Sequence, residues 1–75
     1  MAKLPSLTAR KVVRALPRAG FVEDRQKGNH LILIHPGTKA RTVVPIHAGR
    51  TIKAPLIRAI IRDAGLSLDE FVELL

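Results

Sequence analysis

Three strand-like segments within residues 21–47, separated by two turn sequences, constrain the fold of this chain most strongly. The turns are Lys27-Gly28-Asn29 and Pro36–Lys39, which carry the glycine, asparagine and proline residues typical of chain reversals. The segments between and around them are Phe21–Gln26, His30–His35 and Arg41–His47. Strands joined by such short connections pair with their neighbours, so the sequence predicts a three-stranded antiparallel meander.

Helical patterns flank these strands on both sides. Ser6 and Thr8 can each cap a helix, and apolar residues recur at helical spacing over residues 7–19, although Pro17 should kink or tighten the last turn. Pro55 suits the first turn of a second long helix with an apolar stripe, and Ser67–Glu70 has the capping-box pattern of a short third helix. The predicted order is αβββαα. We expect a small two-layer sandwich of the α+β class, with helices on one face of the sheet and the other face open.

Side chains alternate between the faces of a strand, so the length of the second turn decides which residues share a face with His30. A two- or four-residue loop places His30 on the same face as Pro45 and His47, whereas a three-residue loop separates the histidines. We expect the even case, because two-residue loops are favoured and Gly37-Thr38 suits one. Pro45 lacks an N–H group and indicates an edge strand. Residues 48–53 have the composition of a loop.

The composition limits the class of protein. With 75 residues, 47% of them hydrophobic, the chain is expected to form a single domain over residues 1–75. Phe21 and Phe71 are its two aromatic residues, which argues against recognition of single strands by base stacking. No cysteine is present, so disulfides, thiolate metal sites and cysteine nucleophiles are excluded. Because the sequence has neither the apolar core of a signal peptide nor an apolar run of membrane-spanning length, we expect a soluble, cytoplasmic protein without membrane contact.

The net charge of +7 is distributed unevenly along the chain. All 13 lysine and arginine residues lie within residues 1–62, where Glu23 and Asp24 are the two acidic residues. Residues 63–75 contain four acidic residues and no basic one. A basic body favours an anionic partner such as nucleic acid, although a solvated basic surface explains the composition equally well.

His30 is the main candidate for chemistry, because a flexible turn places its titratable imidazole at the start of an apolar strand. RNA can be cleaved without a metal when a base removes the 2′-hydroxyl proton, cations stabilise the phosphorane and an acid protonates the leaving oxygen. His30 could be the acid or the base, with Arg25, Lys27 and the amides of Gly28 and Asn29 near the phosphate. From the residues alone, however, a strand-end histidine that hydrogen-bonds to a neighbour is the more common case.

The other titratable residues offer weaker sites. His47 could simply close the third strand, and His35 is expected to be a turn residue. Glu23 and Asp24 are adjacent on a strand and should point to opposite faces. Since no carboxylate has ligand-like spacing from a histidine, no metal site and no cofactor are expected. Both serines lie at predicted helix caps, which leaves no candidate nucleophile.

Four segments follow, in order and over nearly the whole chain, the pattern of a known family. They are Leu16-Pro17-Arg18-Ala19-Gly20-Phe21, Gln26-Lys27-Gly28-Asn29-His30, Val43-Val44-Pro45-Ile46-His47, and Ile60-Ile61-Arg62-Asp63-Ala64-Gly65 followed by Glu70-Phe71. With these segments the chain resembles the HicA toxins of bacteria and archaea. The resemblance implies a fold like that of double-stranded-RNA-binding domains, cleavage of messenger RNA, and inhibition by the antitoxin HicB.

The resemblance also implies roles for particular residues. His30 matches the catalytic histidine of the family's glycine-serine-histidine turn, and the segment Val44–His47 matches a second signature whose histidine has a less defined role. The chain departs from the family pattern at two places. Asn29 replaces the usual serine, and Ala54-Pro55 replaces the usual glycine-threonine, which removes a threonine cap from the second long helix.

Taken together, the sequence and the resemblance predict a toxin of a type II toxin–antitoxin system that acts as a metal-independent endoribonuclease on messenger RNA and inhibits translation. The expected catalytic residue is His30, with Lys27, Gly28, Asn29 and His47 as active-site neighbours. The residues expected to contact RNA are Arg10, Lys11, Arg25, Lys27, Arg41, Arg50 and Lys53. The expected partners are the RNA and a HicB-like antitoxin, through which the protein could oligomerise. Two alternatives stay open: a non-catalytic module that binds RNA or DNA, and an adaptor that dimerises through the open sheet face.

Overall fold

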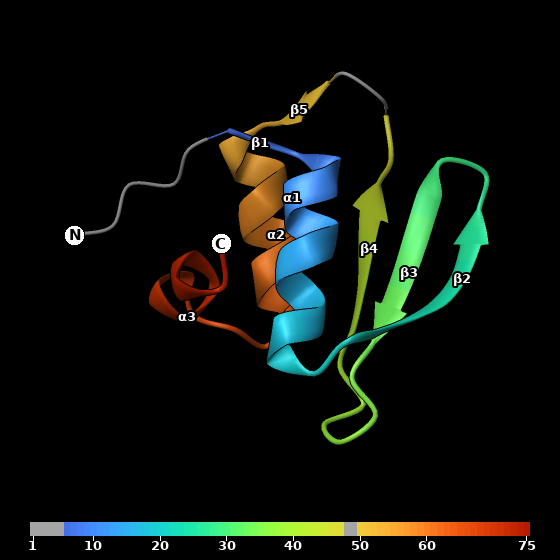
Figure 1. Ribbon diagram of the computed structural model, residues 1–75, viewed down its shortest axis with the longest axis vertical. Helices are drawn as coiled ribbons and strands as arrows, with labels where there is room; N and C mark the ends of the chain where they lie inside the picture. The colour runs from blue at the N-terminus through green and yellow to red at the C-terminus, as the bar shows by residue number, and fades with distance from the viewer. Residues whose placement is uncertain (1–5, 48–49) are drawn as a thin grey trace.

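A computed structural model of the protein describes residues 6–47 and 50–75 and consists of two layers (Figure 1). Strands β2, β3 and β4 form an antiparallel sheet in that order, and helices α1 and α2 lie side by side across one face of it. The elements are β1 (Leu7–Thr8), α1 (Ala9–Ala15), the 3₁₀ helix η1 (Leu16–Ala19), β2 (Val22–Lys27), β3 (His30–Ile34), β4 (Arg41–Pro45), β5 (Thr51–Ile52), α2 (Ala54–Ala64) and α3 (Leu68–Glu73). The predicted α+β class with a three-stranded antiparallel sheet is confirmed.

The first helix begins at Ala9, two residues later than predicted, because β1 pairs antiparallel with β5 in a separate two-stranded sheet. Thr8 still caps the helix, since its Oγ1 accepts a hydrogen bond from the Lys11 N–H at 3.3 Å. The α-helix ends at Ala15 and continues as the tighter helix η1, in which Pro17 cannot donate a backbone hydrogen bond. The predicted tightening at Pro17 is therefore confirmed.

The other element boundaries differ from the predicted ones by a few residues. β2 extends to Lys27, so the turn before β3 contains only Gly28 and Asn29. β4 ends at Pro45 rather than at residue 47, because the next N–H group, that of Ile46, donates to the carbonyl oxygen of Asn29 instead of to a ladder. The predicted loop 48–53 contains β5, while residues 48 and 49 lie outside the described part of the chain. The second long helix begins after Lys53 without a side-chain cap, as the loss of the usual threonine predicts.

Six residues, 35–40, join β3 to β4, and the innermost four, 36–39, form the turn. The His35 N–H donates to the Ala40 carbonyl at 2.9 Å and closes the loop. The register places His30 opposite Pro45, so the expected even loop length is confirmed. The expected two-residue turn is wrong, because Nδ1 of His35 accepts hydrogen bonds from two N–H groups inside the loop, at 3.0 Å each, and stabilises the wider turn.

The core lies between the helices and the sheet face that carries Leu31, Leu33 and Val44. The predicted apolar stripe of α2 is buried there from Ile57 to Ala64, whereas Leu56, which the pattern also assigns to the stripe, is exposed. Thr42 is also buried, and its hydroxyl donates to the Ile60 carbonyl at 3.0 Å, which ties β4 to α2. The opposite sheet face is left open by the helices, as predicted (Figure 1). In the described part of the chain, no helix has the length and apolar character needed to cross a membrane.

Of the glycines within residues 6–47 and 50–75, Gly20 should be the least replaceable. Its φ is +98°, and a Cβ added there would lie 2.7 Å from Nε2 of His35. Gly65 also has a positive φ, +75°, but has open space around it. In Gly65→Ala the only expected cost is that of an alanine in the left-handed backbone conformation, ~1–2 kcal/mol. We expect Gly20→Ala to lower the free energy of unfolding by more, because the new Cβ would also collide with the His35 ring. Urea denaturation of both variants measures the difference; equal losses would mean that the His35 ring moves away without cost.

The capping box of α3 should make stability depend on pH. The Ser67 N–H donates to Oε1 of Glu70 at 2.8 Å, and this backbone hydrogen bond, followed by that of the Ser67 side chain, lowers the pKa of Glu70 below its ordinary value of 4.5. The contribution to stability is therefore complete above pH 4.5 and is lost as the pH falls through the lowered pKa of the folded state. Glu70→Gln keeps an acceptor oxygen but cannot titrate. We expect its urea midpoint to fall less between pH 6 and pH 3 than that of the parent; parallel curves would contradict this.

Candidate functional site

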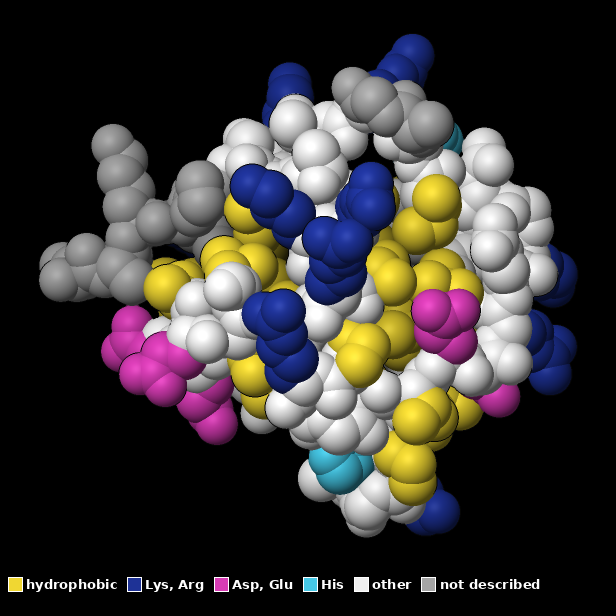
Figure 2. All heavy atoms as spheres, viewed as in Figure 1, with side chains coloured by type: hydrophobic (Ala, Val, Ile, Leu, Met, Phe, Trp, Pro, Cys, Tyr) yellow, Lys and Arg dark blue, Asp and Glu magenta, His cyan; other side chains and the backbone are white. Residues whose placement is uncertain are grey.

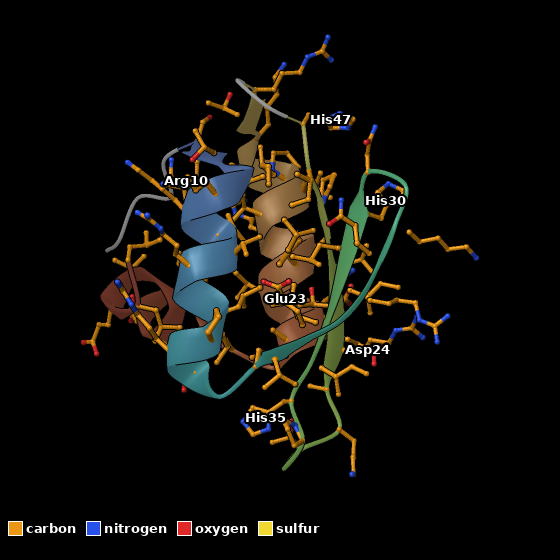
Figure 3. All side chains as sticks on the ribbon, turned by 45° about the vertical axis from the view of Figure 1, so that its right-hand side comes forward. Arg10, Glu23, Asp24, His30, His35 and His47 are labelled. Carbon is orange, nitrogen blue, oxygen red and sulfur yellow. The ribbon has the colours of Figure 1, made fainter. Side chains whose placement is uncertain are left out.

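His30 lies at the end of the β2–β3 hairpin, where the backbone is held from both sides (Figure 3). Its Cα pairs with Lys27 in β2 and with Pro45 in β4. The two-residue turn before it begins with Gly28 at φ +59°, as type II′ hairpins require, and Nε2 of Gln26 donates to the Gly28 carbonyl at 3.2 Å. The hairpin end thus fixes the backbone of an exposed imidazole.

The three histidines have different surroundings. Among the described residues, no group hydrogen-bonds to the ring of His30, which is exposed. The His35 ring accepts two loop N–H groups and packs edge-on against Phe21, with 5.3 Å between ring centroids. His35 is therefore a turn residue, as predicted. The sequence left open that His30 has an ordinary structural role, with its ring hydrogen-bonded to a neighbour. The described residues provide no such hydrogen bond.

The register aligns side chains in rows across the open face of the sheet. Lys27, His30 and Pro45 form the row at the hairpin end, and Arg25 belongs to the next row. Arg41 begins β4 and lies four residues from Pro45 along that strand, about 13 Å at ordinary strand rise. Lys27 thus lies directly beside His30, and Arg25 lies one row away. Arg41 lies at the other end of the face.

His47 does not join this row. It follows the end of β4, so strand alternation no longer determines its direction, and the expectation that it shares a sheet face with His30 is not met. Its exposed side chain instead lines a groove between α1 and β2, on the helix side of the sheet, and also a neighbouring hollow beside Lys53. Figure 3 shows His30 and His47 near the same end of the molecule.

The groove between α1 and β2 has a volume of about 590 Å³. Its floor is apolar, and its rims carry charged and polar side chains from opposite sides, including Arg10 of α1 and Glu23 of β2 (Figure 3). The lining residues are Thr8, Ala9, Arg10, Val13, Glu23, Gln26, Leu31, Ile46, His47 and Arg50. Of these ten residues, Arg10, His47 and Arg50 were predicted as site residues, whereas the other seven, Glu23 and Gln26 among them, were not. Within residues 6–47 and 50–75, no three histidine, aspartate or glutamate side chains gather as a metal site would need.

The seven residues expected to contact RNA do not form one surface. Arg25, Lys27 and Arg41 belong to the open sheet face. Arg10 and Lys11 lie on α1, on the other side of the molecule, and Arg50 and Lys53 flank β5. Figure 2 shows basic side chains gathered over the face that α1 presents and acidic side chains at its lower left, where α3 lies. Arg18 of η1 reaches the end of α3, since its Nη1 donates to the Leu74 carbonyl at 2.6 Å. The exposed basic residues of α1 and η1 are Arg10, Lys11, Arg14 and Arg18.

One family model matches the part of the chain that contains the three-stranded sheet and His30. A family model described as "HicA toxin of bacterial toxin-antitoxin" matches residues 9–66 of the 75. No curated protein matches the chain. The matched region runs from the start of α1 to just beyond α2, so it includes His30, the hairpin and every groove-lining residue except Thr8, and excludes α3.

Proposed function

The chain belongs to the HicA toxin family, and is thus a toxin with a cognate antitoxin, and we propose that it acts as a metal-independent endoribonuclease on messenger RNA, with His30 as the catalytic residue. The two-layer α+β fold is consistent with the double-stranded-RNA-binding-domain-like fold of that family. The observation that supports the activity best is the exposed His30 ring on a backbone paired with both neighbouring strands, without a hydrogen bond among the described residues and with Lys27 directly beside it.

The geometry suits transfer of a proton at a phosphodiester. In the proposed reaction, His30 removes the proton of a 2′-hydroxyl, whose oxygen attacks the adjacent phosphorus as the bond to the 5′-oxygen breaks. The products are a 2′,3′-cyclic phosphate and a 5′-hydroxyl. Paired residues on one strand face have Cβ atoms about 5 Å apart, so the Lys27 ammonium can reach the phosphate next to His30 and stabilise the phosphorane. Lys27 and His47 are the candidates for the group that protonates the leaving oxygen.

The antitoxin is proposed to cover the hairpin end and its basic surroundings. An acidic or otherwise complementary surface would meet Arg25 and Lys27 on the open face and exclude RNA from His30. Binding to the folded state alone also raises stability by mass action, which matters for a domain of this size. A complex in which the His30 side chain stays accessible would contradict this form of inhibition.

The test is incubation of the purified protein with a defined single-stranded messenger RNA in EDTA, followed by a sequencing gel and analysis of the new 3′ ends. Discrete cuts that end in a cyclic phosphate support the proposal. Retained binding without cleavage would instead indicate the non-catalytic nucleic-acid-binding module. A stable dimer without nucleic-acid binding near physiological salt would indicate the adaptor.

A further inference from the structure

An irregularity in β2 brings two acceptor side chains to one face of the sheet. In a regular strand, residues three apart, such as Glu23 and Gln26, point to opposite faces. Here the pairing of β2 with β3 shifts between Glu23 and Arg25, so Asp24 is an extra residue, as in a β-bulge. Glu23 consequently lies opposite Leu33 and Gln26 opposite Leu31, and both side chains line the groove beside α1. Asp24 is not part of that lining.

The chemistry of this rim is that of a hydrogen-bond acceptor. A carboxylate such as that of Glu23 only accepts. The amide nitrogen of Gln26 uses one of its two N–H groups to donate to the Gly28 carbonyl, at 3.2 Å, while its Oε1 has no partner among the described residues and can accept from a ligand. The facing rim is cationic, with Arg10 and Arg50, and the floor between the two rims is apolar. The groove therefore suits a flat group with an edge of N–H donors and an attached anion.

Among the RNA bases, guanine offers this edge. Its N1–H and N2 amino group are adjacent donors that one carboxylate can bind together, whereas the other three bases place an acceptor next to each donor of that edge. We propose that the groove between α1 and β2 binds a guanine base of the RNA substrate, with Glu23 and Gln26 accepting from the base and Arg10 and Arg50 binding flanking phosphates. The inference rests on the proposed function for the identity of the ligand as RNA.

The position of the groove connects guanine binding to cleavage. Gln26 pairs with Leu31, and the next pair along the hairpin is Lys27 with His30. The groove and His30 thus lie on opposite faces of the same hairpin end, and β2 is an edge strand of its sheet. An RNA strand can pass around this edge from one face to the other. The bound guanine would then determine which nearby phosphodiester meets His30.

The test measures binding without cleavage, by fluorescence anisotropy with 2′-O-methyl oligouridylates that carry one guanine, one adenine or one inosine. These strands lack the attacking hydroxyl. We expect the guanine strand to bind about 10-fold more tightly than the adenine strand, equivalent to about 1.4 kcal/mol. Inosine, which lacks the N2 amino group, should fall between them. Free guanosine monophosphate should compete more weakly than the strand; competition as strong as that of the strand would overturn the assignment to RNA.

Two variants with the same change of charge separate base recognition from general electrostatics. Glu23→Gln should bind all strands somewhat more tightly but lose the guanine preference. Asp24→Asn should gain similar general affinity and keep the preference, because its carboxylate lies outside the groove. A parent without guanine preference, or a folded Glu23→Gln protein that retains it, would overturn the inference. Cleavage of RNA by the parent is scored separately, so guanine-selective binding without cleavage would remove the proposed function and leave this site.

Discussion

Replacing His30 with alanine is expected to reduce the rate of RNA cleavage by about 10²- to 10⁴-fold, the usual contribution of a positioned acid or base. Stability should change little, since the side chain is exposed and its ring has no hydrogen bond within the described residues. The measurement is a single-turnover cleavage assay in EDTA, with the melting temperature of each protein determined in parallel. A folded variant that cleaves at the parent's rate would exclude His30 as the catalytic residue.

His35 provides the matched control for this experiment. Its ring accepts hydrogen bonds from the N–H groups of Gly37 and Thr38, so His35→Ala leaves two donors without their partner and should lower the melting temperature. It lies at the opposite end of β3 from His30. At a temperature where both variants are folded, His35→Ala should cleave RNA at nearly the parent's rate. The two histidines should therefore give opposite patterns of activity and stability.

Replacing Phe71 with alanine is expected to lower the free energy of unfolding by about 3–5 kcal/mol. Phe71 is fully buried and is the main contact of the short helix α3 with the core, against which Leu68 packs as a partly buried residue. A 75-residue domain has a total stability of only about 4–11 kcal/mol, so this change should remove a large part of it. The measurement is urea denaturation followed by circular dichroism.

Leu75→Ala is the control for Phe71→Ala, because it removes an apolar side chain that is 44% exposed. We expect it to cost less than about 1 kcal/mol. Similar urea midpoints for the two variants would mean that α3 contributes little to the fold. Phe71 belongs to the Glu70-Phe71 segment of the resemblance but lies outside residues 9–66, which match the family model, so this result would also show whether the domain depends on residues beyond that match.

Local signals in the sequence predicted most of the fold. The stripe of α2, the capping box of α3 and the turn at Gly28 each depend on residues close together in the chain, and the structure contains all three. The two-residue strands β1 and β5 could not be predicted, since they are too short to show a period and pair with each other across most of the domain. Their pairing depends on how the helices pack, which no local pattern contains.

The candidate site was only partly visible in the sequence. His30 and Lys27 stand out because a glycine turn and an apolar strand adjoin them. The groove could not be found in the sequence. All six residues of β2 are exposed, so no alternation of apolar and polar residues shows that Asp24 is an extra residue. The regular alternation of side chains along a strand assigns Glu23 and Gln26 to opposite faces, and only the extra residue brings them to the same one. A bulge is set by the pairing of two strands, and a sequence pattern in one strand cannot report it.

The extra residue in β2 also has a consequence for how copies of this protein behave in concentrated solution. An exposed edge strand presents unpaired N–H and C=O groups that can recruit a strand from another molecule and start aggregation. Here the register of the edge strand shifts at Asp24, which interrupts the regular ladder that a second strand would extend, and its charged side chains Glu23, Asp24, Arg25 and Lys27 are exposed to solvent. The residue that shapes the groove therefore also protects the free edge of the sheet from self-association.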